Sequence, residues 1–389
     1  MDLFKSLKEF FLRNRRRLQE DSYDSLLWLV NIIPNLVGFS INRKKISAPF
    51  WIVHMILLLY VYGVGCIVYM VRDAKTAGDY IKNFVNISLF CLIANNSWWF
   101  LTKRPLLKEA LKKIKENDGL AHQNVTLQSK QKKILRRIRL MILTFLIFNY
   151  MDEFFIYLPH RADVMNDNYS MTPCVGLEPL TSSPNREVCH IILGLQEITI
   201  VTVVLNYQAL MLFLIGHTAV MYQMLAYEMI SLNDFTNLKD HQLFVKQKLP
   251  SLIYRHSLTL DVTYKLKSLY SVPMGVNFGS NAVCISLFFY LPFEEWLQFI
   301  PILMYCFLVF FLYCFLCQKL INASEIFERA VYSCGWENFD LKEKKLVYVM
   351  LRQAQKPVEI LAADIIPVNI YTFATTLQAM FKFVTVVKF

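Results

Sequence analysis

The sequence has few charged side chains and little that could carry catalysis. Charged residues make up 18% of the chain and histidines number seven, against 55% hydrophobic residues. There is no glycine-rich phosphate-binding loop, no His-Glu-x-x-His metal motif and no zinc-like repeat of Cys-x-x-Cys pairs. We therefore expect neither an enzyme nor a bound metal or cofactor. The composition is too apolar for most soluble domains and predicts a polytopic membrane protein.

Two further absences narrow the class of membrane protein. No internal repeat relates one half of the chain to the other, which argues against a secondary transporter. No cleavable signal precedes the first uninterrupted apolar run, which begins at Phe50, so we expect this run to act as a signal anchor.

The apolar runs predict an all-α fold with seven transmembrane helices, since a bilayer core of ~30 Å needs about 20 apolar residues per helix. The predicted spans are 50–71, 84–101, 141–158, 191–226, 272–291, 296–316 and 365–387, and the last belongs to an apolar helix expected to run from about 360 to 387. The fifth and sixth spans are separated only by a tight turn at 292–295. An earlier run, 25–40, is short and broken by Pro34, which favours a re-entrant or interfacial segment over a span.

The distribution of Lys and Arg predicts the orientation of the spans. Segments 1–49, 103–139, 227–271 and 317–364 hold nine, twelve, six and seven of these residues, or 34 of the 41 in the chain. Since cytoplasmic flanks retain basic residues, we expect the N-terminus inside and the C-terminus outside. A G-protein-coupled receptor would have the opposite orientation, so the charge distribution argues against that class. Anionic inner-leaflet lipid explains the basic clusters better than nucleic acid does, so membrane lipid is an expected partner and nucleic acid is not.

These spans divide the chain into four parts. We expect a cytoplasmic N-terminal segment over 1–49, a bundle of six spans over 50–316, a cytoplasmic anchor segment over 317–359 and the last transmembrane helix over 360–389. The polar, helix-compatible segments 227–267 and 318–355 predict that spans four and six extend below the bilayer into a cytoplasmic anchor layer. Such a layer suggests assembly with other subunits.

The segment 159–190 is acidic and is expected to lie outside the cell. Cys174 and Cys189 are its only two cysteines and are the candidates for a disulfide there, although the sequence leaves open whether they are bonded. The triplet that begins at Asn168 is a glycosylation acceptor, which would be used only on the outer side.

Motifs near the end of the chain resemble those of the insect odorant receptors. They are Ala330-Val331-Tyr332 with Trp336, then Arg352 and Gln355-Lys356-Pro357, then Pro367-Val368-Asn369, Thr372-Phe373 and the closing Phe383-Val384-Thr385-Val386-Val387. A weaker similarity covers His256, Tyr270-Ser271 and Asn277-Phe278. Asn369 stands where the family usually has Ser, and Lys382 and Lys388 are unusual charges. A gustatory receptor would share the architecture, but its usual Thr-Tyr-hydrophobic-Gln-Phe motif is absent.

The resemblance implies a ligand-gated, non-selective cation channel in the plasma membrane of olfactory sensory neurons. Four seven-helix subunits would meet at their last helices around a path for permeant cations, and a small volatile organic ligand would bind inside the bundle. This chain lacks the long insertion that the co-receptor carries between spans four and five. It therefore resembles a ligand-specific tuning subunit, whose partner in a heterotetramer would be the co-receptor.

A polar stripe on the last helix is the candidate pore lining. Helical spacing of three and four residues places Gln378, Lys382, Val386 and Phe389 on one face, with Thr385 beside it. A polar stripe in a bilayer should face protein or water, and a hydrophobic gate is expected near Val386. The alternative for Lys382, that it extends to the outer interface, stays open.

A pocket for a small volatile molecule needs apolar walls with one or two hydrogen-bonding groups. The outer halves of spans two to five offer such side chains. The candidates are Phe84, Ile87, Ser88, Tyr150, Glu153, Phe154, Tyr157, Ile198, Thr199, Thr202, Met274, Phe278 and Asn281. The adjacent carboxylates Asp152 and Glu153 favour a structural or pocket-rim role, with an ion site as the alternative.

Overall fold

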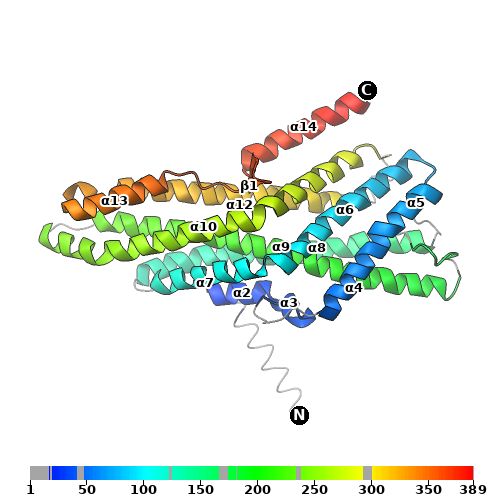
Figure 1. Cartoon of the computed structure of the whole chain (residues 1–389), viewed down its shortest axis with the longest axis horizontal. Coiled ribbons are helices and arrows are strands. Elements are labelled where there is room, and N and C mark those ends of the chain that lie inside the picture. The colour runs from blue at the N-terminus through cyan, green and yellow to red at the C-terminus, as the bar shows by residue number, and fades with distance from the viewer. Residues whose placement is uncertain are drawn as a thin grey trace, which may run out of the picture.

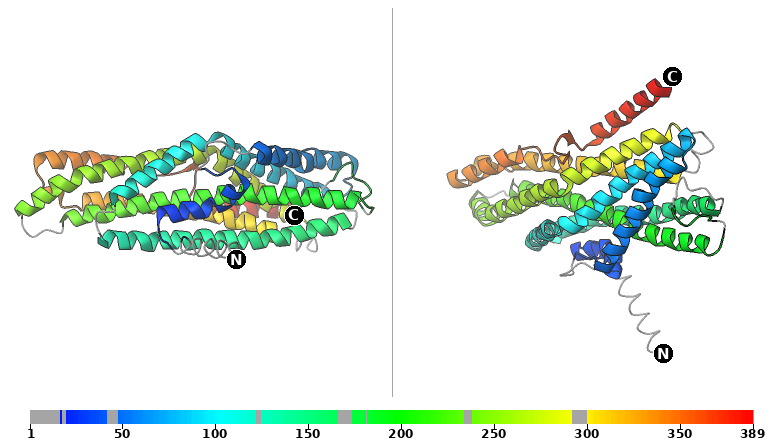
Figure 2. Two further views of the ribbon diagram at one scale, coloured as in Figure 1. Left: turned by 90° about the horizontal axis from the view of Figure 1, so that it is seen from below. Right: turned by 45° about the vertical axis from the view of Figure 1, so that its right-hand side comes forward.

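The computed structural model describes Arg17 and residues 20–41, 48–121, 125–165, 174–180, 182–233, 238–291 and 300–388. The predicted turn at 292–295, the glycosylation acceptor Asn168 and the terminal Phe389 lie outside these residues. Nearly everything described is helical, and the long helices run side by side along one axis (Figures 1 and 2). The predicted all-α class is confirmed.

Helices occur at all seven predicted spans. They are α4 (Ala48–Leu58) with η1 (Leu59–Gly65) and α5 (Cys66–Arg72), then α6 (Ala77–Thr102), α8 (Val125–Met165), α9 (Asn185–Ile230), α10 (Leu238–Phe288), α12 (Ile300–Tyr332) and α14 (Ile370–Lys388). Within the described residues, four helical stretches are long and apolar enough to cross a membrane: Ala48–Arg72, Ala77–Thr102, Asn185–Asn233 and Ile300–Asn338. The chain is thus a membrane-spanning helical protein. The other three spans, on α8, α10 and α14, remain predictions.

Helix α9 forms the centre of the bundle. Its residues from 201 to 222 are all buried, because the other long helices surround it. It packs mainly against α12 and α8, and also against α10, α6 and α4. A helix that is apolar all round belongs in the middle of a structure, and the long apolar run of the fourth span meets that requirement.

A proline inside α10 creates a specific contact with α6. Pro273 has no N–H, so the carbonyl of Leu269, four residues earlier, loses its helical donor. The indole Nε1 of Trp99 on α6 donates to this carbonyl at 2.9 Å. The rings of Tyr207 and Tyr270 lie 5.1 and 5.6 Å from that of Trp99. The hydrogen bond from Trp99 to the otherwise unpaired carbonyl of Leu269 therefore fixes the position of α6 along α10.

The segment before the last helix is a small hairpin and not part of that helix. Strands β1 (Leu361–Ala362) and β2 (Ile366–Pro367) pair antiparallel, and the turn between them places Ala363 and Asp364 at φ 52° and 58°. Helix α14 begins only at Ile370. The prediction that it starts near 360 was wrong, because apolar character does not reveal two left-handed turn residues followed by a proline.

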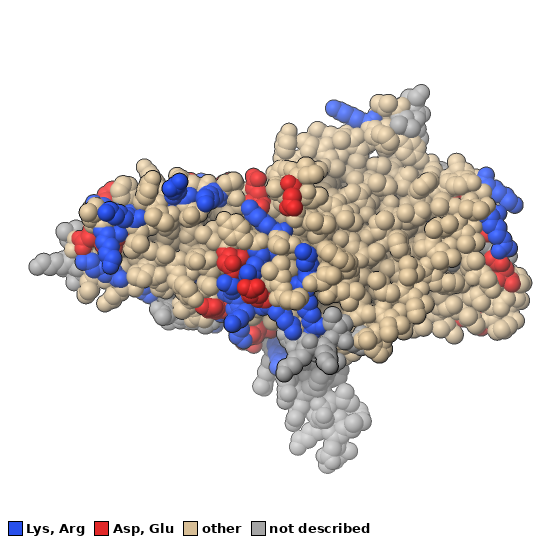
Figure 3. All heavy atoms as spheres, in the orientation of Figure 1, with Lys and Arg blue, Asp and Glu red and all other residues tan. Residues whose placement is uncertain are grey.

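The end of the molecule opposite the apolar bundle is polar. It contains α7 (Arg104–Ala121), α13 (Leu341–Ala354) and the ends of α9, α10 and α12 (Figure 1). Figure 3 shows Lys, Arg, Asp and Glu gathered over this end and the middle, while the broad region over α4, α5 and α6 shows almost none until its far edge. Helix α12, which carries the sixth span, extends into the polar end as predicted. Helix α9, which carries the fourth span, ends at Ile230, and the polar segment from Leu238 onward extends the fifth span on α10 instead. The position of the polar end on the cytoplasmic side remains a prediction.

The run 25–40 forms two short helices, α2 (Tyr23–Val30) and α3 (Ile32–Val37). Helix α3 ends at Gly38, whose φ of 97° is readily adopted only by glycine. Both helices pack against α9. Neither is long enough to span a bilayer.

Candidate functional site

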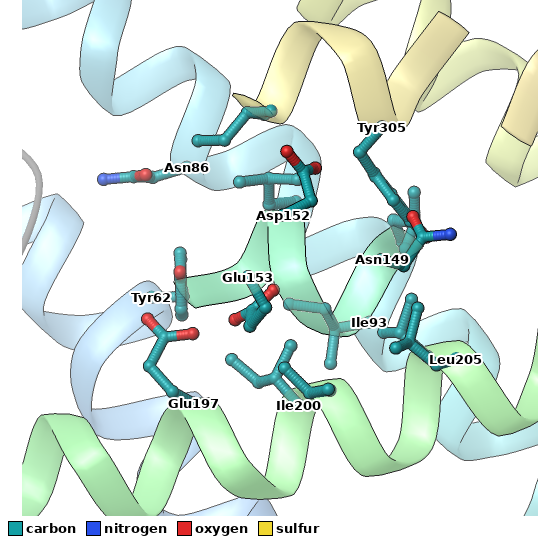
Figure 4. A pocket seen from close by; sticks show the side chains of 15 residues that line it. Tyr62, Asn86, Ile93, Asn149, Asp152, Glu153, Glu197, Ile200, Leu205 and Tyr305 are labelled. Atoms are coloured by element: carbon teal, nitrogen blue, oxygen red, sulfur yellow. The ribbon is translucent and has the colours of Figure 1, made fainter. Parts of the chain in front are cut away.

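A cavity lies inside the bundle between α6, α8, α9 and α12, with η1 at its side (Figure 4). It encloses about 720 Å³ of space, part of it open to the surroundings. The residues that line it are Tyr62, Asn86, Leu89, Leu92, Ile93, Asn149, Asp152, Glu153, Glu197, Ile200, Val201, Val204, Leu205, Ile302 and Tyr305. A mostly apolar wall with a few polar groups is typical of sites for small organic molecules.

Three carboxyl groups face this cavity. Asp152 and Glu153 are neighbours on α8 and point to different sides, because successive residues of a helix are about 100° apart. In Figure 4, Asp152 points toward α12, while Glu153 points toward Glu197 on α9. The side chains of Glu153 and Glu197 hydrogen-bond to each other. Among the described residues that line the cavity, none is Lys, Arg or His.

Three of the cavity's oxygen atoms, those of Asn149, Asp152 and the Tyr305 hydroxyl, have no hydrogen-bond partner among the described residues of the protein. Asn149 is 2% exposed, and its Nδ2 donates to the carbonyl of Phe145, but its Oδ1 is unpaired. One carboxyl oxygen of Asp152, Oδ2, is likewise buried without a hydrogen bond. Buried polar atoms are normally paired. The cavity therefore presents acceptors that a ligand or water could satisfy.

A second hollow adjoins the first on the outside of α8 and α9. Its lining includes Ile33, Tyr150, Glu153, Phe154, Gly194, Glu197, Ile198, Val201 and Thr202. Glu153, Glu197 and Val201 are common to both hollows. Phe154 and Ile198 are 60% and 64% exposed, so this hollow opens toward the surroundings of the bundle.

A disulfide-bonded segment supports the cavity from one side. Cys174 and Cys189 are bonded, which confirms the pair suggested by the sequence. They and Leu180 belong to one buried cluster with Leu58, Val61, Tyr62, Leu92, Ile93, Leu193 and Val204. Tyr60 also donates a hydrogen bond to the carbonyl of Val175 at 2.8 Å. Because Tyr62, Leu92, Ile93 and Val204 also line the cavity, the bonded segment holds part of its wall in place.

The structure brings five of the predicted ligand-binding residues to these hollows. Glu153 lines both, while Tyr150, Phe154, Ile198 and Thr202 line the outer one. The side chain of Tyr157 lies outside the described residues.

The predicted residues of α6 and the buried residue of α9 lie elsewhere. Phe84 is 51% exposed, Ser88 donates to the carbonyl of Phe84 within its own helix, and Ile87 lines neither hollow. Asn86 and Leu89 are the residues of α6 that reach the cavity instead. Thr199 is buried and its hydroxyl lies 3.0 Å from Nδ1 of His54.

The predicted residues of α10 form packing contacts outside both hollows. Met274 is fully buried and Asn281 is 1% exposed. The ring of Phe278 lies 4.7 Å from that of Phe310 on α12. Helix α12, through Ile302 and Tyr305, supplies the cavity wall that was expected from α10.

Sequence reasoning missed Glu197, although a signal for it existed. It is the only charged residue in the apolar run 191–226, and an ionisable residue inside a span is a functional candidate by default. Asn149 offered no comparable signal, because many buried asparagines only bond to their own helix.

The candidate pore residues lie on a helix that stands away from the bundle. Helix α14 projects from the body and contacts it mainly near its start (Figures 1 and 2). Gln378, Lys382, Thr385 and Val386 are exposed, Val386 by 77%. Their place in a pore remains a prediction, since it depends on subunits beyond this chain.

Comparison with known proteins shows the family. The family model described as 7tm Odorant receptor matches residues 78–381. Among curated proteins, Odorant receptor 67a of Drosophila melanogaster is 29% identical over 147 residues, which cover 36% of each chain. Odorant receptor 10a of the same species is 25% identical over 184 residues, covering 44% of this chain and 45% of the relative. The aligned parts thus span less than half of either relative.

Solved structures share the fold. The insect olfactory receptor OR5 from Machilis hrabei in complex with eugenol superposes with a TM-score of 0.74 at 17% identity, over 92% of this chain and 96% of that one. The same receptor described without eugenol gives a TM-score of 0.73 at 18% identity, over 92% and 97%. With most of its length matched by the family model, the chain belongs to the insect odorant receptors, a family of receptors and not of enzymes.

Proposed function

We propose that the chain is a ligand-specific odorant receptor subunit that binds a small volatile organic molecule in the cavity between α6, α8, α9 and α12. The observation that carries this proposal is the cavity itself, a mostly apolar space with a few polar groups inside the bundle of a chain of this family. The related OR5 has been described in complex with the small aromatic molecule eugenol.

The subunit would act in a heterotetramer with the co-receptor, in the plasma membrane of olfactory sensory neurons. The last helices of the four subunits would surround a path for permeant cations, with membrane lipid around the assembly. The exposure of Gln378, Lys382, Thr385 and Val386 on α14 supports this arrangement, because an exposed polar stripe on a membrane helix needs protein or water beside it.

Helix α12 offers a physical connection between the cavity and α14. Ile302 and Tyr305 line the cavity. Further along the same helix, the rings of Phe310 and Phe311 lie 5.0 and 5.6 Å from that of Phe373 on α14. A ligand that binds one arrangement of α12 more tightly would shift the population of α14 positions, and the gate near Val386 would then open.

Odorant-evoked current in cells that express the chain with and without the co-receptor tests the proposal. Ile200→Trp places a large ring in the cavity and should raise the half-maximal odorant concentration by roughly tenfold or more, equivalent to about 1.4 kcal/mol of lost binding. Leu195→Trp is the control, since Leu195 lies on the same helix, is 48% exposed and lines neither hollow. Absence of any odorant-evoked current, or equal effects of both substitutions, would contradict the proposal.

An epitope placed after Phe389 tests the predicted orientation. Antibody should label intact cells that also express the co-receptor. Labelling only after permeabilisation would place the C-terminus inside and would contradict the channel architecture.

A further inference from the structure

The charged groups of the cavity are all acidic, while the hydroxyls of Tyr62 and Tyr305 and the amides of Asn86 and Asn149 can also donate hydrogen bonds. Asp152, Glu153 and Glu197 contribute carboxyl oxygens, and Asn149 contributes an amide oxygen. No Lys, Arg or His stands among the described lining residues to balance the three acidic groups. A purely apolar odorant would form neither a hydrogen bond nor an ion pair with these groups.

Two of the three unpaired atoms in the cavity wall are carboxyl or amide oxygens, and the third, the hydroxyl of Tyr305, can both donate and accept. Asn149 is 98% buried, and its only unpaired atom, Oδ1, is an acceptor. Asp152 Oδ2 is a second buried acceptor without a donor. Leaving a buried acceptor unsatisfied costs about 1–3 kcal/mol, and more when it is charged. A ligand that brings donors and positive charge would remove this cost, whereas one that brings only acceptors would not.

The Glu153–Glu197 contact strengthens the argument. The carboxyl groups of Glu153 and Glu197 point toward one another, and two carboxylates so placed would repel. A cation placed beside them would stabilise both charges. Carboxylates in a membrane interior are expected to be paired in some such way.

The residues that line the cavity favour an organic cation over a metal ion. Within the described residues, no three His, Cys, Asp or Glu side chains converge so as to hold a metal ion. Most of the remaining wall is aliphatic, including Leu92, Ile93, Ile200 and Val204. The occupant therefore needs a cationic head and an apolar body.

We propose that the cavity is selective for small organic cations, namely volatile amines that are protonated at neutral pH, with the ammonium group at Glu153 and Glu197. An ammonium supplies three donors and no acceptor, which complements the carboxyl and amide oxygens around it. This inference rests on the proposed function, because it names the ligand class of the same cavity.

The test compares amines with alcohols of the same shape. Hexylamine and 2-phenylethylamine are set against 1-hexanol and 2-phenylethanol in cells that co-express the chain and the co-receptor. We expect the amines to be effective at concentrations roughly tenfold or more below those of the alcohols, as one charge-assisted hydrogen bond would give. Glu197→Gln keeps the shape and removes the charge, so it should reduce the ratio of alcohol to amine effective concentrations to near one.

Glu187→Gln is the matched control, because Glu187 is exposed on the same helix and pairs with Arg186 outside the cavity. It should leave both ligand classes unchanged. Glu153→Gln provides a second cavity variant in case Glu197→Gln fails to reach the cell surface, which surface labelling would reveal. Calorimetric titration of hexylamine into the detergent-purified chain measures binding without gating.

The outcomes separate this inference from the proposed function. Alcohol-evoked currents that Ile200→Trp weakens, without any amine preference, would overturn the amine inference and leave the receptor function standing. Hexylamine binding that Glu197→Gln abolishes, without any evoked current, would support the inference and contradict the channel function. An amine preference that survives both Glu197→Gln and Glu153→Gln would overturn the role of the carboxyl pair.

Discussion

The junction between α10 and the last helix makes a sharp prediction about two glycines. The hairpin turn before α14 is seated on α10, where the N–H of Ala363 donates to the carbonyl of Ser271 at 2.8 Å and the N–H of Asp364 donates to its Oγ, also at 2.8 Å. Gly275 lies one helical turn further along, and Gly279 one turn beyond that. Only Gly275 lies under the hairpin.

Alanine should be tolerated less well at Gly275 than at Gly279. A Cβ at Gly275 would lie 2.7 Å from the Cβ of Ala363, whereas a Cβ at Gly279 would meet nothing within 4 Å. Carbon atoms pack at about 3.5–4.0 Å, so the hairpin must move by roughly 1 Å to accept Gly275→Ala. Overpacking of this kind costs about 1–3 kcal/mol. Both substitutions gain about 1 kcal/mol of helix propensity.

The difference between the two variants removes the propensity gain and leaves the overpacking, about 1–3 kcal/mol. Thermal unfolding of the detergent-purified variants measures this difference. We expect Gly279→Ala to be at least as stable as the wild type and Gly275→Ala to be less stable than Gly279→Ala. Because the hairpin leads into α14, Gly275→Ala should also change the maximal current at saturating odorant. Equal stabilisation by both substitutions would show that the hairpin does not rest on Gly275.

Three other predictions use contacts elsewhere in the chain. Trp99→Phe should destabilise the protein by about 1–3 kcal/mol, because it leaves the carbonyl of Leu269 unpaired. In a double-mutant cycle, Pro273→Ala should reduce that loss, since residue 273 then has an N–H that can donate to the same carbonyl. Strictly additive effects of the two substitutions would disprove the pairing of Trp99 with Leu269. Cys174→Ser should lower the free energy of unfolding by about 3 kcal/mol, the value expected when a disulfide closes a loop of 15 residues, and should weaken odorant responses. Unchanged melting temperature and unchanged responses would show that the bonded segment does not support the cavity. Burial lowers the pKa of His256 from 6.5 to about 4. Between these pH values the unfolded chain binds a proton that the folded chain does not, so the free energy of unfolding should fall by up to roughly 3 kcal/mol as the pH drops from 6.5 to 4. In melting curves recorded at several pH values, His256→Gln should make this fall smaller.

Several features could be predicted from the sequence because they depend on composition and local pattern. Each of the seven apolar runs lies on a helix, and the motifs between Ala330 and Val387 suffice to suggest the family that the comparisons show. The candidate disulfide was also accessible, since Cys174 and Cys189 were the only two cysteines in their loop.

The predictions that failed depended on which helix faces meet. Phe84 and Met274 have side chains suited to a ligand pocket, yet one lies at the surface and the other in the packed core. The start of α14 was predicted ten residues too early, because Ala363 and Asp364 adopt positive φ angles that their residue types do not predict. Glu197 was overlooked although its charge within an apolar run marked it.

The sequence by itself determined the helical class, the number and position of the apolar runs and the concentration of 34 of the 41 basic residues in four segments between or before those runs, since each of these follows from residue type along the chain. The tertiary structure decided that α9 occupies the centre, that α12 and not α10 closes the cavity, and that Glu153 meets Glu197 within it. The physical reason is that a helix apolar on all sides gives no preferred face. Which neighbour each side of such a helix contacts is settled only when all the helices pack together.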